Sequence, residues 1–222
     1  MNNPGRTIVL TVFTLCLILS GCKQTVKENE IKKLWLDCKL EGVLSFEIFD
    51  QAMAGYRQLD VFKKKNILTI IDYSKPSGED RFFVIDLEKK KVLFKCLVAH
   101  GKNSGESIAT SFSNQSGSLK SSTGFFLTAE TYVGENGYSL RLDGLEKGIN
   151  DSARFRDIVI HGADYVSRKF IEANGRLGRS WGCPALPLEV SKDIIDIISE
   201  GSCLFVYSAD KEKSNIYSGK NK

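Results

Sequence analysis

The feature that most constrains the fold is a change in the spacing of apolar residues near residue 66. From there, short runs rich in β-branched and aromatic residues follow one another, each bounded by Gly, Ser, Asn or charged residues. These runs cover residues 67–73, 81–87, 91–99, 124–129, 138–142, 156–161 and 203–207. The pattern predicts one mainly β (α+β) domain over residues 66–208.

Helical spacing is found on both sides of this region. Ile31, Leu34, Trp35 and Cys38 recur at helical intervals, and residues 49–59 repeat the pattern. We therefore expect residues 31–65 to form an N-terminal helical segment that packs outside the sheet. Near the C-terminus, Pro187 suits the first helical position, an apolar face follows it, and Gly201 is placed to end the helix.

The two ends of the chain differ from the domain. Residues 1–21 read as a signal peptide, with Arg6 before an apolar run and small residues at the end. Leu19-Ser20-Gly21-Cys22 resembles the lipobox of bacterial lipoproteins, in which the cysteine is lipidated; a plain secretory signal with an incidental cysteine is the alternative. Residues 22–30 are expected to be a tether, and residues 209–222, polar and charged, a disordered tail.

This interpretation predicts an exported lipoprotein, membrane-anchored in the bacterial cell envelope, on the periplasmic side or at the outer membrane. The net charge of +4, from 31 basic and 27 acidic residues, includes no long basic block, so a nucleic-acid partner is not expected. We expect a monomer.

The chain has six cysteines and two histidines, and these numbers limit which disulfides, metal sites and catalytic groups it can form. Without Cys16 and Cys22, four cysteines remain, and Cys96 and Cys203 lie in apolar runs where Cys packs as a small hydrophobic residue. The chain therefore does not have the pattern of a disulfide scaffold. With two histidines and no clustered Cys, Asp or Glu, no metal site is predicted, which argues against a zinc hydrolase.

Two motifs together suit a thiol enzyme. Cys183 lies in Gly178-Arg179-Ser180-Trp181-Gly182-Cys183-Pro184, and His161 ends the apolar run Ile158-Val159-Ile160 before Gly162. A thiol attacks as the thiolate, so it needs a base nearby, and imidazole is suited to that task. The pairing predicts that Cys183 has a lowered pKa. Taken alone, His161 could be a structural histidine and Cys183 an inert buried thiol.

These motifs resemble the active-site signature of the YkuD-like L,D-transpeptidase catalytic domain family, in the branch with Gly-Arg-Ser-Trp-Gly-Cys-Pro. The similarity extends through residues 121–126 and 98–101 and covers roughly residues 66–207. It implies an L,D-transpeptidase-type β-sandwich with N-terminal helices and one helix after the cysteine. It also implies a cofactor-free acyltransferase that acts on tetrapeptide stems of peptidoglycan, releasing D-Ala through a thioester acyl-enzyme.

The resemblance assigns roles to individual residues. Cys183 is the nucleophile, His161 the base and acid, and the backbone of Gly182 and Cys183 the oxyanion donor. Ser180 occupies the hydroxyl position of the signature, where it orients His161 or the substrate, or only stabilises the turn. Tyr165 and Asp164, just after the histidine, are candidates for the pocket wall, with surface residues on a turn as the alternative, and Gly162 is a candidate for substrate binding.

The chain departs from the common family pattern at three places. Trp181 replaces a histidine, the Asn or Arg usual after the cysteine is missing from Pro184-Ala185-Leu186, and Ser121-Ser122 replaces Thr-Pro. Arg179 or Arg176 is therefore predicted to hold a stem-peptide carboxylate, with solvated surface charge as the alternative. His100, in a second strand-end His-Gly pair, is a candidate for substrate contact or for anchoring its loop.

Two other functions stay open at this stage. An L,D-carboxypeptidase has the same first step but lets water resolve the acyl-enzyme. A non-catalytic wall-binding lipoprotein keeps the fold without the chemistry.

Overall fold

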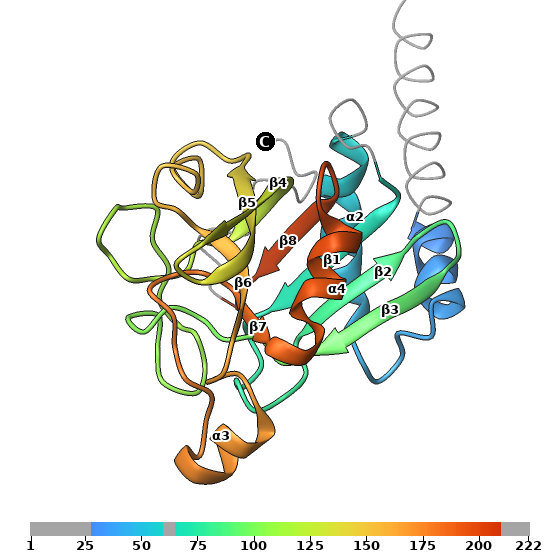
Figure 1. Cartoon of the computed structure of the whole chain (residues 1–222). Helices are drawn as coiled ribbons and strands as arrows, with labels where there is room; N and C mark the ends of the chain where they lie inside the picture. The colour runs from blue at the N-terminus through green and yellow to red at the C-terminus, as the bar shows by residue number, and fades with distance from the viewer. Residues whose placement is uncertain (1–27, 60–64, 210–222) are drawn as a thin grey trace, which may run out of the picture.

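The computed structural model describes residues 28–59 and 65–209. Its centre is one eight-stranded sheet in the order β3-β2-β1-β8-β4-β5-β6-β7 (Figure 1). The strands are β1 (Ile67–Asp72), β2 (Phe82–Asp86), β3 (Lys91–Cys96), β4 (Gly124–Gly134), β5 (Gly137–Gly144), β6 (Val159–Ala163), β7 (Ala185–Pro187) and β8 (Cys203–Tyr207). The helices are α2 (Phe46–Gln58), α3 (Arg168–Asn174) and α4 (Leu188–Ile198), and residues 28–37 are also helical.

Most neighbouring strands are antiparallel, but two pairs are parallel. One is β1 with β8, which ties the C-terminal strand into the middle of the sheet. The other is β6 with β7, in which His161 lies opposite Ala185. This second pair matters for function, because it brings the two candidate motifs to neighbouring strands.

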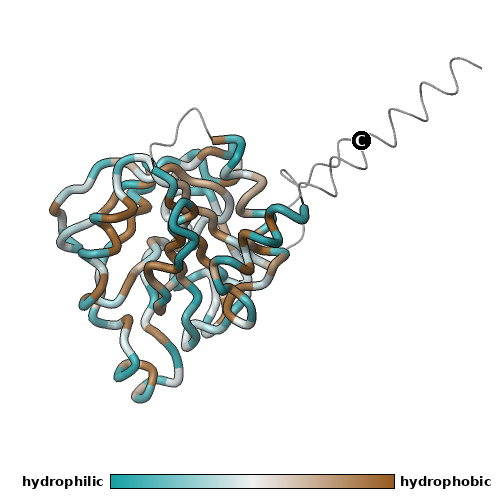
Figure 2. The backbone as a smooth tube through the Cα atoms, turned by 90° about the vertical axis from the view of Figure 1, so that its right-hand side faces the viewer, coloured by the Kyte–Doolittle hydropathy of each residue, from teal (hydrophilic) through white to brown (hydrophobic). Residues whose placement is uncertain are grey.

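Apolar residues of the sheet face two separate layers. Helix α4 covers one face, where Ile194, Ile195 and Ile198 pack against residues of β1, β2, β4, β5, β6 and β8. Helix α2 and the helical residues before it cover the other face of β1, β2 and β8. Figure 1 shows α2 and α4 on opposite sides of the sheet, and Figure 2 shows hydrophobic segments concentrated along the interior.

Local sequence explains where these elements begin and end. The Ser45 side chain accepts a hydrogen bond from the N–H of Ile48 and so caps α2, whose apolar residues share one side. Pro187 is the last residue of β7 and the N-cap of α4, so the helix begins one residue later than predicted.

The predicted fold class is confirmed: the domain is mainly β, with N-terminal helices and one helix, α4, after Cys183 and β7. Some boundaries differ. The run predicted for residues 156–161 becomes strand only at Val159, because Asp157 has a positive φ of 51°, outside the strand region. Helix α3 was not predicted, and none of its residues is buried.

The signal peptide, Cys22 and most of the tether lie outside the described residues, as does nearly all of the predicted tail. Within residues 28–59 and 65–209, no helix is long and apolar enough to cross a membrane.

Candidate active site

The turn that carries Cys183 depends on glycine. Gly182 has a φ of 135°, and a Cβ there would lie 2.9 Å from the Lys120 carbonyl oxygen and 2.9 Å from Ile158. A side chain at this position would therefore be strained and crowded. The tight turn presents Cys183, which is half-buried, beside the beginning of β6.

The sulfur of Cys183 makes two backbone contacts there. It donates to the carbonyl oxygen of Asp157 at 3.4 Å and accepts from the N–H of Val159 at 3.5 Å. Burial raises the pKa of the thiol, and the Val159 N–H and the positive charge of Arg156 oppose that effect only in part. The predicted lowered pKa of Cys183 is therefore wrong for the resting protein, because the cost of burying a thiolate dominates.

His161 is 4% exposed and is the middle residue of β6, where it pairs with Ala185 of β7. Its Nδ1 lies 2.9 Å from the Gly162 carbonyl oxygen, which can only accept, so Nδ1 carries the proton. The Nε2 atom is then the unprotonated nitrogen. Burial lowers the pKa of His161, so the imidazole is neutral near neutral pH and ready to accept a proton.

Ser180 stabilises the turn rather than touching His161. Its Oγ donates to the Cys183 carbonyl oxygen at 2.6 Å and accepts from the Gly182 N–H at 3.1 Å. The expected oxyanion donor at Gly182 is therefore occupied by Ser180. Cys183 N–H makes no hydrogen bond to another described residue, so it is the backbone donor that remains for an oxyanion.

His100 is fully buried, unlike a substrate-contacting residue. Its Nδ1 lies 2.8 Å from Nη2 of Arg81, which can only donate, and its Nε2 lies 3.2 Å from the Gly105 carbonyl oxygen. Both ring nitrogens are thus engaged, and burial together with Arg81 lowers its pKa to about 4. Of the two predicted roles, these contacts support loop anchoring and contradict substrate contact.

The buried loop that contains His100 holds the cysteine turn in place. The His100 carbonyl accepts from the Ser180 N–H at 3.0 Å. Ser121, one of the two residues that replace Thr-Pro, accepts from the Gly101 N–H and donates to the Gly182 carbonyl, both at 3.0 Å. The segment before β4 is therefore part of the site's framework.

The two motifs singled out from sequence thus converge on one edge of the sheet, with the Cys183 turn directly before β7 and His161 on β6. A family model described as L,D-transpeptidase catalytic domain matches residues 40–207.

The chain belongs to the L,D-transpeptidase catalytic domain family.

Comparisons with other proteins give a more distant likeness. No curated protein matches the chain. An L,D-transpeptidase from Mycobacterium smegmatis is 15% identical, with a TM-score of 0.39, over 64% of this chain and 59% of that one. The helical cell shape determining protein Pgp2 from Campylobacter jejuni is 14% identical, with a TM-score of 0.46, over 68% and 50%. The chain therefore spans less than two thirds of either of these proteins.

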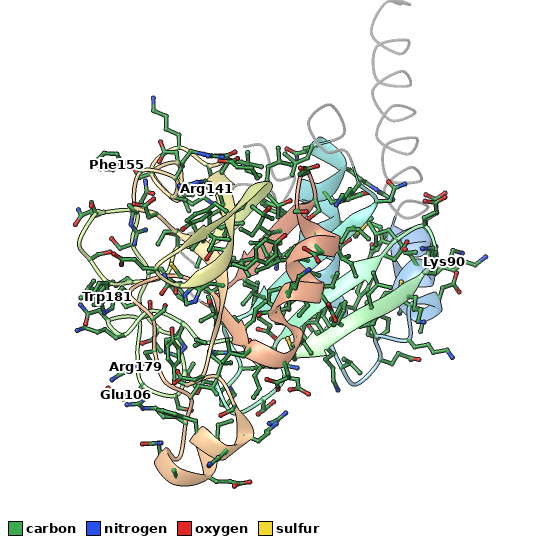
Figure 3. The ribbon with its side chains drawn as sticks, in the orientation of Figure 1. Lys90, Glu106, Arg141, Phe155, Arg179 and Trp181 are labelled. Atoms are coloured by element: carbon green, nitrogen blue, oxygen red, sulfur yellow. The ribbon has the colours of Figure 1, made fainter. Side chains whose placement is uncertain are left out.

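Among the residues predicted to bind substrate in this L,D-transpeptidase domain, the two arginines share one partner. Arg179 Nη1 lies 2.7 Å from Oε1 of Glu106, and Arg176 Nε lies 3.0 Å from Oε2 of the same carboxylate. Figure 3 shows Arg179 and Glu106 side by side. Arg179 also donates to the carbonyl of Gly105, so these side chains link the cysteine loop to residues 102–106 instead of standing free for a ligand.

Tyr165, Gly162 and Trp181, which the sequence also singled out, lie in different surroundings. Tyr165 packs where a Cβ at Gly178 would fall, 2.4 Å from its own Cβ, and burial raises its pKa to about 12, with Cys183 contributing. Gly162 faces α4, where a Cβ would meet Ser191 Oγ at 2.5 Å. Trp181 is 76% exposed and projects from the surface, as Figure 3 shows.

Sequence reasoning missed Arg156, which it placed in a strand without a role. The guanidinium lies beside the cysteine turn, and its Nη2 would be 3.5 Å from a Cβ at Gly182. No motif marks this residue. The only signal in the sequence is a basic residue five positions before His161.

Elsewhere, a cavity of about 320 Å³ opens between the N-terminal segment, β3 and α3, away from the cysteine. Its cations are largely engaged: Lys75 donates to the Val43 carbonyl, and Arg168 binds the Gly78 carbonyl and Asp80. Among the described residues, no three His, Cys, Asp or Glu side chains gather as metal ligands would. The chemistry of the Cys183 turn therefore defines the candidate site.

Proposed function

We propose that the protein is an L,D-transpeptidase that acts on tetrapeptide stems of peptidoglycan through a thioester on Cys183. The observation that carries this proposal is the pairing of β6 with β7. His161, a neutral imidazole with its proton on Nδ1, is on β6, and the turn that carries the Cys183 thiol leads directly into β7, in a domain that belongs to this family.

In the first half of the reaction, His161 Nε2 takes the proton from the Cys183 thiol as the sulfur attacks the carbonyl carbon of the third stem residue. The carbonyl oxygen becomes an oxyanion that accepts a hydrogen bond from the Cys183 N–H. When the C–N bond to D-Ala breaks, protonated His161 returns the proton to the leaving amine. A thioester and free D-Ala result.

In the second half, the amine of another stem attacks the thioester carbonyl. His161 takes a proton from that amine and gives it to the leaving sulfur, which restores the thiol and forms a new amide bond. Water in place of the amine would give a tripeptide, so the identity of the acceptor separates the transpeptidase from an L,D-carboxypeptidase.

The purified domain incubated with tetrapeptide muropeptides tests this proposal. We expect cross-linked dimers and free D-Ala by mass spectrometry, and neither from a Cys183→Ala variant. Tripeptides without dimers would assign the carboxypeptidase activity instead. Products that persist in the Cys183→Ala variant would refute Cys183 as the nucleophile, and a lack of products from both proteins would favour a non-catalytic wall-binding module.

A carbapenem supplies an independent probe of the nucleophile, because ring opening by the thiolate leaves a covalent adduct. Peptide mapping should find that adduct on Cys183 alone. The thiols of Cys38, Cys96 and Cys203 in the same protein serve as internal controls.

We also propose that the protein is exported and tethered to a membrane through a lipid on Cys22. The support is the Leu19-Ser20-Gly21-Cys22 sequence after an apolar run. In cells, the protein should be labelled by a fatty-acid analogue and sediment with membranes. Cys22→Ser should lose both properties, whereas Cys16→Ser should keep them.

A further inference from the structure

Arg156 is held in an unusual manner beside the cysteine turn. Its Nη1 donates to the Ser113 carbonyl and to Ser122 Oγ, each at 2.5 Å. Its Nη2 donates to the Lys120 carbonyl at 2.7 Å and to Ser118 Oγ at 3.2 Å. All four terminal N–H groups of the guanidinium are therefore used, and the side chain is fixed in one position.

Each of these four partners is electrically neutral. In the described part of the chain, Arg156 makes no ion pair, whereas nearby Arg154 binds the carboxylates of both Asp143 and Glu130. The guanidinium is also half-buried, so water screens its charge less than that of a surface arginine. The result is a fixed, uncompensated positive charge at the site.

This charge lies against the peptide unit that presents the nucleophile. The Lys120 carbonyl that accepts from Arg156 is also the atom that would lie 2.9 Å from a Cβ at Gly182, and Arg156 Nη2 would lie 3.5 Å from it. Cys183 follows directly. The Lys120 ammonium itself points elsewhere and donates to Ser111 Oγ.

We propose that Arg156 supplies the fixed positive charge that stabilises the anionic sulfur of Cys183, and the oxyanion beside it, during acyl transfer. The role in acyl transfer rests on the proposed function, whereas the effect on the sulfur does not. In this chain Arg156 thus provides the charge for which the sequence suggested Arg179 or Arg176, both of which are bound to Glu106.

The other titratable groups near the sulfur of Cys183 either disfavour its anionic form or carry no charge. Asp157 is negative and raises the pKa of Cys183, while burial raises the pKa of Tyr73 and of Tyr165 to about 12, so both stay neutral. His161 is neutral at rest because burial lowers its pKa. Arg156 is the one positive side chain that acts on Cys183 among the described residues.

A purely structural role would give a different result from an electrostatic one, because the four hydrogen bonds also tie residues 113–122 to the site. The rate of Cys183 alkylation by iodoacetamide as a function of pH separates the two roles. It reports the thiolate fraction and needs no peptidoglycan. Mass mapping of the Cys183 peptide excludes the other thiols.

We expect Arg156→Gln to slow alkylation of Cys183 about tenfold near pH 8, with the rate at the alkaline plateau unchanged, since one nearby charge shifts such an equilibrium by roughly that factor. Arg156→Lys, which keeps the charge, should stay within about threefold of the unmodified protein. Arg154→Gln, a neighbouring arginine outside the site, is the matched control and should show no change. Superimposable pH profiles for Arg156→Gln and the unmodified protein would overturn the proposal.

A measurement on the unmodified protein covers the case in which Arg156→Gln does not fold. Anionic iodoacetate and neutral iodoacetamide are compared at Cys183 in the folded chain and in the chain unfolded in urea. A fixed cation should raise the iodoacetate-to-iodoacetamide rate ratio in the folded chain. A ratio equal to or below that of the unfolded chain refutes the proposal, even if the domain proves to be an active transpeptidase.

Discussion

His100 should make the protein less stable in mild acid, and its burial sets the size of the effect. The ring is fully buried, and its pKa falls from 6.5 to about 4, first because of burial and then because of the Arg81 charge. The unfolded chain binds a proton at His100 below pH 6.5, whereas the folded chain does not until about pH 4. Stability from this residue is therefore complete above about pH 6.5 and is lost as the pH falls below it.

The magnitude follows from linkage. Each pH unit between the two pKa values costs about 1.4 kcal/mol of unfolding free energy for one proton. Between pH 7 and pH 4.5, the expected loss from His100 is about 2.5 kcal/mol, given the folded value of about 4. This is a large part of the 5–15 kcal/mol that roughly spans the stability of most domains.

The perturbation is His100→Gln, whose amide can accept from Arg81 and donate to the Gly105 carbonyl without titrating. Urea unfolding followed by circular dichroism at pH 7 and pH 4.5 gives the free energy of unfolding of both proteins. His161 and the carboxylates titrate alike in the two, so the difference between the two pH dependences isolates His100. We expect the variant to be less stable at pH 7 but to lose about 2.5 kcal/mol less than the unmodified protein on acidification.

If both proteins lose the same free energy between pH 7 and pH 4.5, the buried, neutral state of His100 is wrong. The same would hold if His100→Gln lost more than the unmodified protein.

Four substitutions at the site test its other parts. His161→Gln should lower kcat by about 10²–10⁴ while Cys183 is still alkylated at high pH, and an unchanged kcat would remove the histidine from the mechanism. Ser180→Ala should lower the unfolding free energy by about 1–2 kcal/mol and kcat about tenfold, since two hydrogen bonds of the turn are lost; equal kcat values would show that the turn needs neither. Gly182→Ala should abolish turnover because of its φ and the close Lys120 carbonyl, as a steady-state assay would show; wild-type turnover would contradict the crowding. Trp181→Ala should leave Tm unchanged, because the ring is exposed, and raise KM; a lower Tm would show that the ring packs in the fold.

Seven of the eight strands of the sheet could be predicted from sequence because each is a short apolar run between turn residues, and every predicted run contains or overlaps an observed strand. Strand β7, which is only three residues long, was not predicted. His161 and Cys183 could be singled out as candidate site residues as well, since each lies in a recognisable motif. The parallel pairing of β6 with β7 then supplied what the sequence lacked, the adjacency of the two motifs in space.

The roles of charged and polar side chains could not be predicted, because they depend on the path of the long segment before β4. That segment has no apolar periodicity, yet it contributes Glu106, which forms ion pairs with both Arg176 and Arg179. It also contributes the neutral hydrogen-bond acceptors around Arg156. The role of His100 likewise depends on a contact with Arg81, 19 residues away in the chain. Motif spacing carries no information about such contacts.

The resting site keeps its proton on sulfur, and three features point the same way. Burial raises the pKa of Cys183 and lowers that of His161, so the neutral thiol and neutral imidazole are favoured over the ion pair. The thiol also donates to the Asp157 carbonyl rather than to the imidazole. In the proposed reaction, transfer of the proton to His161 therefore requires the sulfur to leave Asp157. We propose that a bound substrate carbonyl draws the sulfur away from Asp157, so that proton transfer to His161 is favoured when an acyl donor is present.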